Sequence, residues 1–356
     1  MRLETLGFDA WYQERTGGEH PPDCKPARVT AVHRGSYLLH GEHGTSSAEL
    51  TGKYLYAASS STDYPTVGDW VMAQFFDGGD FAVIHTLLPR KTLLKRKTPG
   101  RMDVQLLAAN IDTAFIVQAV DGNAGLNRLE RYLVMVNEAG CKPVLLLSKT
   151  DLMEQEDVTT LTAELRAAQP ELEVRAFSNQ SQDGIEHVRA LLEPGKTYCL
   201  LGSSGVGKSS LLNNLLGEEA IAVGDVRAWD GKGRHTTTSR QLHSLAGGAL
   251  FIDTPGMREL GNFDVEEGLV STFDDIYELA EQCRFSDCTH VHEAGCAVLA
   301  AVEAGDMDRN HYENYIKLQR ESSYYSMSEL ERRERSRLLG KTYKAIQKSK
   351  RKGKGL

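Results

Sequence analysis

The residues best suited to chemistry form a glycine-rich run in the second half of the chain. Residues 202–209 read GSSGVGKS and match a phosphate-binding P-loop at every fixed position. In such a loop, glycines let consecutive backbone N–H groups approach phosphate oxygens, because a side chain there would block them. A lysine then contacts the β- and γ-phosphates, and the next hydroxyl binds Mg²⁺. The predicted phosphate site comprises Gly202, Ser203, Ser204, Gly205, Val206, Gly207, Lys208, Ser209 and Ser210, with Lys208 in catalysis and Ser209 on the metal.

A second motif precedes the P-loop. Ser148, Lys149, Thr150 and Asp151 directly follow the apolar run 143–147, where a sequence [N/T/S]-K-x-D selects guanine. The aspartate accepts hydrogen bonds from the guanine N1–H and exocyclic amine, a donor pair that adenine lacks. Lys149 would lie across the base. Ser148 stands where asparagine is more common and cannot make an amide contact, and residues 177–179 (FSN) are a weak match to the loop that meets guanine O6.

Two loops after the P-loop have residues that respond to a γ-phosphate. Residues 231–238 (GKGRHTTT) offer a threonine for Mg²⁺: Thr237 and Thr238 are the predicted candidates, and Thr236 also stays open. Residues 253–256 (DTPG) match D-x-x-G, in which Asp253 would hold a magnesium water and the Gly256 N–H would contact the γ-phosphate.

The residue after this motif is Met257, where many GTPases have a glutamine that orients the attacking water. A thioether cannot orient water, so slow intrinsic hydrolysis is expected. His235 is the nearest titratable residue in the sequence that could act instead. The other interpretation is that His235 anchors its loop or contacts RNA.

A fourth group predicts a structural metal site. Cys283, Cys288, His290 and Cys296 lie within fourteen residues, and thiolates with one imidazole form the closed tetrahedral sites of structural Zn²⁺. His292 is the rival histidine. The remaining cysteines, Cys24, Cys141 and Cys199, are scattered, which does not suggest a secreted disulfide framework.

The elements that must position these residues follow from hydrophobic patterning. Apolar runs and amphipathic segments alternate from 110 to 216, which predicts a parallel α/β sheet. Short alternating runs in 28–90 predict a small β-barrel of the oligonucleotide-binding (OB) type. Four aromatic residues of this segment could stack on nucleic-acid bases, although such residues more often form the core of a barrel. They are Tyr37, Tyr54, Trp70 and Phe75.

Composition limits the class of protein. The 356 residues are 40% hydrophobic and 25% charged, with no apolar run long enough to span a bilayer and no signal peptide, so a cytoplasmic protein is expected. The net charge of −8 combines an acidic body with a basic tail, because residues 332–356 contain eleven Lys or Arg and one acid, Glu334. This asymmetry predicts contact with RNA.

The order of the motifs resembles the circularly permuted GTPases, because the base-selecting residues come before the P-loop. With the barrel and the cysteine cluster, residues 28–320 resemble the ribosome small-subunit-dependent GTPase A (RsgA/YjeQ) family. The resemblance implies a monomeric GTP hydrolase, stimulated by the 30S small ribosomal subunit, that acts late in its maturation and contacts 16S rRNA through the barrel and zinc segment. GTP and GDP would be its ligands, with Mg²⁺ and one Zn²⁺.

The expected fold is therefore a circularly permuted α/β P-loop GTPase domain between an OB-like barrel and a mainly helical zinc domain. The expected boundaries are an extension (1–27), the barrel (28–90), a basic linker (91–109), the GTPase domain (110–262), the zinc domain (263–330) and the tail (331–356). Two alternatives stay open: a nucleotide-clamped RNA-binding factor with incidental hydrolysis, and an ATP-dependent enzyme in which 148–151 is a coincidence.

Overall fold

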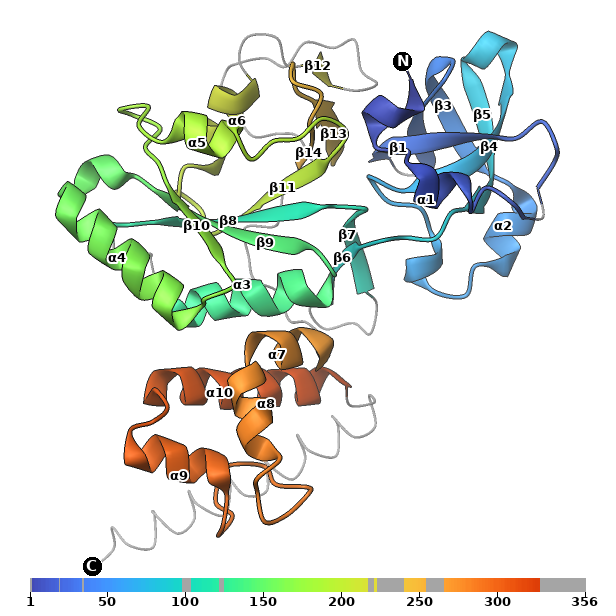
Figure 1. The fold of residues 1–356 in the computed structure, drawn as a ribbon. Coiled ribbons are helices and arrows are strands. Elements are labelled where there is room, and N and C mark those ends of the chain that lie inside the picture. Colours follow the sequence, from blue (N-terminus) through green and yellow to red (C-terminus); the bar gives the residue numbers. More distant parts are fainter. Residues whose placement is uncertain are drawn as a thin grey trace, which may run out of the picture.

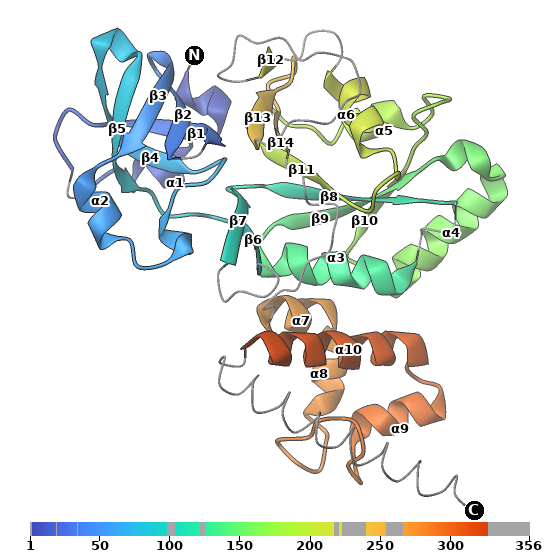
Figure 2. The same ribbon diagram turned by 180° about the vertical axis from the view of Figure 1, so that it is seen from behind.

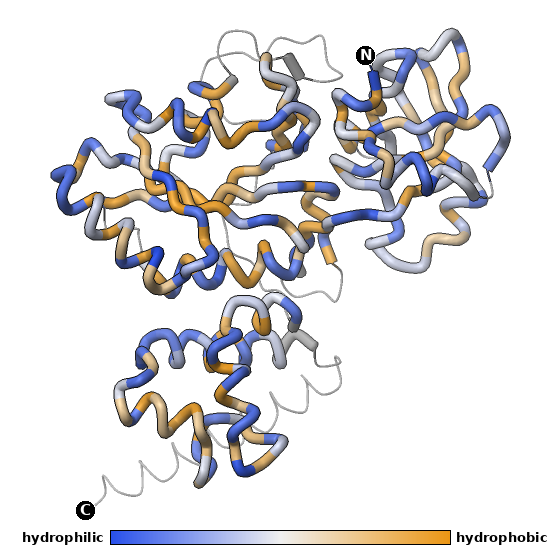
Figure 3. Tube along the Cα trace, viewed as in Figure 1, coloured by the Kyte–Doolittle hydropathy of each residue, from blue (hydrophilic) through white to orange (hydrophobic). Residues whose placement is uncertain are grey.

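In the computed structural model, the described residues are 2–18, 20–33, 35–97, 104–121, 125–216, 221–222, 240–253 and 266–326. They form a barrel, a central α/β sheet and a C-terminal group of helices (Figure 1). Among these residues, no helix is both long and apolar enough to cross a membrane. In Figure 3 the hydrophobic colour is concentrated in the central strands, where the largest core lies.

The barrel confirms the predicted OB type. Its strands pair in the order β1-β2-β3-β5-β4, and β4 pairs with β1 to close the ring. The β3–β5 pair is parallel and the others are antiparallel. Its elements are β1 (Lys25–His33), β2 (Ser36–Gly41), β3 (Gly44–Leu50), α2 (Gly52–Ala57), η2 (Ser61–Asp63), β4 (Trp70–Phe76), η3 (Asp77–Gly79) and β5 (Phe81–Leu87).

The burial of the four barrel aromatics shows whether they form the core or a surface for base stacking. Tyr37 and Trp70 are buried, and Tyr54 is half-buried with its hydroxyl bonded to the Asp63 carbonyl at 2.6 Å. Phe75 packs beside the His43 ring. These four residues belong to the packed body of the barrel rather than to an open stacking surface. The aromatic that stands out is Tyr56 on α2, which is 94% exposed.

The central sheet has the predicted parallel arrangement. Its order is β10-β9-β8-β11-β14-β13, and only the β13–β14 pair within it is antiparallel. Alternate residues of β8 face opposite cores: Ile116 packs with α3 and α4, whereas Phe115 and Val117 pack with α5 and α6 (Figures 1 and 2). The elements are β8 (Thr113–Ala119), α3 (Leu126–Glu138), β9 (Lys142–Ser148), η4 (Thr150–Leu152), α4 (Gln155–Ala168), β10 (Glu173–Ala176), α5 (Ile185–Arg189), β11 (Thr197–Leu201), α6 (Lys208–Leu216), β12 (Ile221–Ala222), β13 (Gln241–Ser244) and β14 (Leu250–Asp253).

The predicted linker at 91–109 instead contains a hairpin. Strands β6 (Leu93–Lys97) and β7 (Val104–Ala109) pair antiparallel, and Leu94 and Leu107 are buried. The basic residues of this segment suggested an exposed connection, but its leucines pack in the same core as residues of α3.

The N-terminal extension also joins the core. The turns η1 (Leu3–Leu6) and α1 (Ala10–Gln13) bury Leu6 and Tyr12 completely or almost so. Tyr12 lies against Phe8 and Trp70, so the extension packs on the barrel wall.

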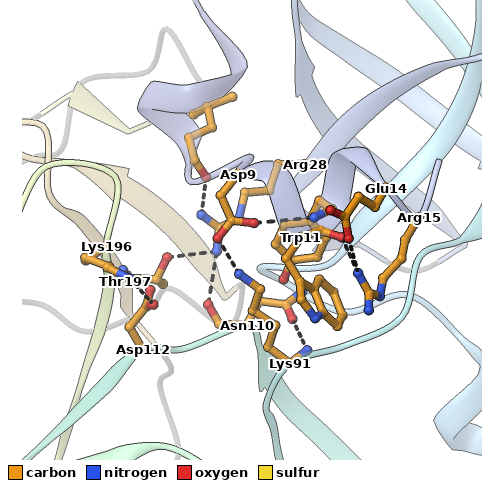
Figure 4. A network of polar contacts seen from close by, with 12 residues as sticks. Asp9, Trp11, Glu14, Arg15, Arg28, Lys91, Asn110, Asp112, Lys196 and Thr197 are labelled. Atoms are coloured by element: carbon orange, nitrogen blue, oxygen red, sulfur yellow. Dashed lines mark hydrogen bonds and ion pairs between the residues drawn. The ribbon is translucent and has the colours of Figure 1, made fainter.

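A buried arginine joins the extension, the barrel and the central sheet (Figure 4). Arg28 of β1 is 1% exposed, and its guanidinium donates to the carbonyls of Leu6, Gly68 (3.2 Å) and Asn110 (3.2 Å) and to the Thr197 hydroxyl (2.8 Å). Burial lowers its pKa to about 10, so it stays charged at neutral pH. Beside it, β1 pairs with β13 through Ala31 and Gln241, which makes the barrel continuous with the central sheet.

The C-terminal helices pack on the other side of α3. They are α7 (Glu266–Thr272), α8 (Asp274–Ala280), α9 (Ala297–Ala304) and α10 (Arg309–Ser326). Their core includes Val134 of α3 together with Phe273, Ile276 and Tyr315. The helix α3 therefore lies between the sheet and this domain (Figure 2).

Charged side chains cross this second junction. The buried Glu130 carboxylate of α3 lies 2.6 Å from His311 Nδ1 and also accepts from Asn314 of α10. The other imidazole nitrogen is 3.1 Å from Asp275 of α8. Burial alone would lower the pKa of His311, but hydrogen bonds to the two carboxylates outweigh it and raise the pKa to about 10.

Candidate nucleotide site and metal cluster

Three loops meet at the carboxyl ends of neighbouring parallel strands. The P-loop follows β11, residues 148–151 end β9 and begin η4, and residues 177–179 follow β10. Because parallel strands end at one edge of a sheet, ligands of α/β proteins bind there. The structure thus brings the predicted phosphate and base residues to one edge.

The P-loop needs its glycines. Gly202, Gly205 and Gly207 have φ of 142°, 81° and 93°, which other residues rarely adopt. A Cβ at Gly202 would lie 2.3 Å from the Val117 carbonyl oxygen. The Lys208 ammonium donates to the carbonyls of Gly202 and Ser203, each at 2.6 Å, so the loop wraps around the charge that would meet phosphate. The helix α6 begins at Lys208, and its N-terminus favours an anion.

The base-selecting loop is held by two side-chain pairs. Lys149 has φ of 60°, and its ammonium lies 2.6 Å from a carboxylate oxygen of Asp121. The Ser178 hydroxyl donates to Asp151 Oδ1 and accepts from the N–H groups of Gln180 (3.0 Å) and Ser181 (3.1 Å). These bonds orient the Asp151 carboxylate, and they give residues 177–179 a place in the site that their sequence only weakly indicated.

Two polar side chains attach the base-selecting loops to the P-loop. Ser148 is buried, and its hydroxyl donates to the Val206 carbonyl at 2.6 Å. Asn179 Nδ2 donates to the Gly207 carbonyl at 3.0 Å, and its Oδ1 accepts from Asn214 of α6 at 3.0 Å. The sequence indicated no role for the side chain of Asn179 and none for Asn214 or Asp121, because their partners are far away in the chain and no local pattern signals such contacts.

Of the switch residues, the structure describes Asp253 only. It ends β14, beside the strand that leads into the P-loop, and is exposed. Burial lowers the pKa of the nearby His243, and the negative charge of Asp253 partly opposes this shift. His235, Thr236, Thr237, Thr238, Gly256, Met257 and the basic tail lie outside the described residues.

The cysteine cluster has the dimensions of a metal site. The ligand atoms of Cys283, Cys288, His290 and Cys296 all lie within 4.8 Å of one another. The Cys283 and Cys296 sulfurs are 3.8 Å apart, and His290 Nδ1 lies 3.6 Å and 3.4 Å from them. A tetrahedron with Zn–S bonds of about 2.3 Å requires S···S near 3.8 Å and S···N near 3.5 Å.

The donor set and spacing therefore fit a four-coordinate ion. Backbone N–H groups of Ala297 and Leu299 also point at Cys283 Sγ and Cys296 Sγ, each at 3.4 Å, as expected around thiolates. The rival His292 is exposed and is not part of the cluster. Its neighbour His290 is buried, and Tyr312 of α10 donates to its carbonyl at 2.7 Å.

The fold and the site define a P-loop GTPase whose sheet is circularly permuted, since the base-selecting loop precedes the P-loop in the chain. The sequence profile described as RsgA GTPase matches residues 87–263. A "Small ribosomal subunit biogenesis GTPase RsgA 2" of Listeria monocytogenes is 41% identical over 352 residues, covering 98% of this chain and 97% of the relative. The chain belongs to the RsgA GTPase family.

Other relatives agree. A protein of the same printed name from Vibrio parahaemolyticus is 39% identical over 98% of this chain and 94% of its own length. The crystal structure of YjeQ from Thermotoga maritima is 28% identical with a TM-score of 0.63, covering 84% of this chain and 98% of that one. The structure of YloQ, described as a circularly permuted GTPase, is 24% identical with a TM-score of 0.61, covers 88% and 100%, and shows the shared fold.

Proposed function

We propose that this chain hydrolyses GTP to assist late maturation of the small ribosomal subunit, and that binding to the subunit accelerates hydrolysis. The names of its relatives support the biological role. The observation that carries the chemistry is the Ser178–Asp151 hydrogen bond, because it fixes a guanine-selecting carboxylate beside a complete P-loop. We expect a cytoplasmic monomer.

In this proposal GTP lies between the P-loop and residues 148–151. Backbone N–H groups and Lys208 hold the phosphates, and Asp151 accepts from guanine. Ser209 and one of Thr236, Thr237 and Thr238 would hold Mg²⁺, and Asp253 would hold a water on that ion, which when bound neutralises charge on the phosphates. His235 would orient the attacking water, because Met257 offers no group that can, and the Gly256 N–H would contact the γ-phosphate.

The other domains would bind RNA. Cys283, Cys288, His290 and Cys296 would hold one Zn²⁺, which when bound stabilises the loop between α8 and α9. The barrel, this loop and the basic tail would contact 16S rRNA. Loss of the γ-phosphate would weaken that contact through the switch loops.

The decisive experiment compares GTP hydrolysis with and without purified small subunits. We expect the subunits to raise the rate by about tenfold or more. Equal rates would contradict the proposal. Nucleotide-dependent retention on subunits without a change in rate would favour the alternative, an RNA-binding factor clamped by nucleotide.

Three variants test the residues. Lys208→Ala is expected to abolish nucleotide binding, whereas His235→Ala should retain binding and lower turnover. Asp151→Asn should shift preference from guanosine toward xanthosine nucleotides, because the amide would donate where the carboxylate accepts. Equal competition of ATP and GTP for the wild-type site would instead show that Asp151 does not select the base.

A further inference from the structure

The contacts around Asn179 suggest a role for this residue in the nucleotide site. Its carboxamide touches two parts of the phosphate-binding unit: Nδ2 lies 3.0 Å from the Gly207 carbonyl of the P-loop, and Oδ1 lies 3.0 Å from Asn214 Nδ2 on α6. The orientation of the amide is determined by its partners, because a carbonyl oxygen can only accept. The fit is close, since a Cβ at Gly207 would lie 2.8 Å from Nδ2.

The neighbouring residue contacts the opposite end of the nucleotide site. Ser178 donates to the Asp151 carboxylate that would meet guanine. Ser178 therefore holds the base-selecting carboxylate, and the next residue, Asn179, holds the phosphate loop. This dipeptide thus links the base-selecting carboxylate to the phosphate loop, in addition to the Ser148–Val206 bond.

Ser148 and Asn179 bond consecutive carbonyls of the P-loop. An asparagine at position 148 would present a carboxamide to the P-loop, whereas Ser148 has one hydroxyl proton, which it gives to the Val206 carbonyl at 2.6 Å. The next P-loop carbonyl, Gly207, is bonded by Asn179 instead.

We propose that Asn179 is a positioning residue for guanine nucleotides: it fastens the Asp151-holding loop to the P-loop and supplies the carboxamide contact that Ser148 is too short to make. The proposal rests on GTP binding at this site. It assigns Asn179 no contact with the nucleotide itself; its effect is exerted through Asp151 and the P-loop backbone.

The test measures the affinities of the full chain for GTP and for ITP, whose base lacks the exocyclic amine. We expect Asn179→Ala to weaken GTP binding about tenfold, as loss of two hydrogen bonds implies, and to reduce the GTP-to-ITP preference. A residue that only stabilised the fold would lower both affinities equally. Asn179→Asp keeps the size of the side chain and the acceptor for Asn214 but places a carboxylate, which cannot donate, against the Gly207 carbonyl. It should also weaken GTP binding and reduce the GTP-to-ITP preference, without leaving a cavity.

The matched control is Gln182→Ala, which removes a 2.6 Å bond to the Asn179 carbonyl but none to the P-loop. It should bind both nucleotides like the wild type. A stricter test uses the double variant that combines Ser148→Asn with Asn179→Ala. The added asparagine should restore most of the GTP affinity and the base preference.

Two results would overturn the inference: wild-type affinity and preference in both Asn179 variants, or no recovery in the double variant while Ser148→Asn alone binds GTP normally. Failure of the wild-type protein to bind GTP would instead overturn the proposed function, so the two are separable.

Discussion

The barrel and the C-terminal helices are attached to the same GTPase sheet by different kinds of contact. The barrel joins through strand pairing and through Arg28, whose four acceptors are all uncharged. The C-terminal domain joins through side chains of α3, among which Glu130 lies buried against His311. We infer that the first junction is largely insensitive to pH and salt, and that the second depends on charge.

Ion pairs also lie near Arg28, but at its margin. Lys91–Asp9 and Lys196–Asp112 are between one third and one half exposed, and such pairs contribute about 0–1 kcal/mol. The difference between the junctions therefore comes from their buried groups. A change of pH or salt should therefore affect the attachment of the C-terminal domain more than the attachment of the barrel.

Removal of the metal should have the largest effect, and only on the C-terminal side. Three cysteines of the cluster pack in or against the core of that domain, whereas the barrel has a core of its own. A strong chelator should therefore expose the amides of α8, α9 and α10 to hydrogen exchange while those of β1–β5 stay protected. His290→Ala should lose bound metal and His292→Ala, the matched control, should keep it. Equal metal content in the two variants would show that His290 is not a ligand.

Glu130→Ala should break the charged junction. It leaves His311 and Asn314 without their buried partner, and removal of one member of a buried pair costs about 3–5 kcal/mol. Chemical unfolding should report this loss, with faster exchange in α7 and α10. Glu156→Ala, on the exposed face of α4, should change stability by less than about 0.5 kcal/mol. Similar losses in both variants would mean that Glu130 has no special role.

Arg28→Met should cost less and should be independent of salt. The methionine fills much of the space but leaves four acceptors without a donor, which we expect to lower the free energy of unfolding by about 2–3 kcal/mol. The loss should be the same at about 0.1 M and 1 M salt, where surface ion pairs are screened. A loss that disappears in high salt would contradict the comparison.

Raising the pH by one unit should change the stability least of the four perturbations. The pKa of His311 is raised to about 10, against about 6.5 in the unfolded chain, so the folded state binds more protons between these values. Its contribution to stability is complete below about pH 6.5 and is lost as the pH rises toward 10. From pH 7 to 8 the loss should approach about 1 kcal/mol. His311→Gln should remove this part of the slope, and an unchanged slope would refute the assignment.

The sequence predicted most of the fold where the signal was local. The P-loop, the strands on either side of it and the cysteine cluster are marked by spacing within a few residues, and the structure places them as expected. The barrel type was predicted from the short alternating runs between residues 28 and 90.

Contacts between residues far apart in the sequence could not be predicted from it. The leucines of β6 and β7 did not reveal their hairpin, because basic residues between them dominated the pattern. Similarly, Tyr37 and Trp70 could be assigned to the core only once the closed barrel was known. In the nucleotide site, Ser178 and Asn179 depend on partners 27 and 28 residues away, which no spacing rule indicates.

The pairing of β1 with β13 has a consequence for synthesis of the chain. The barrel strands span residues 25–87 and can close while the rest is still being translated. The strand that joins the barrel to the sheet, β13, comes after the P-loop, and its partner β14 ends at Asp253. Such distant contacts form slowly. The part of β1 around Ala31 therefore has no strand partner on this side until β13 has been made. We expect this strand pairing between the barrel and the sheet to follow synthesis of the P-loop strand.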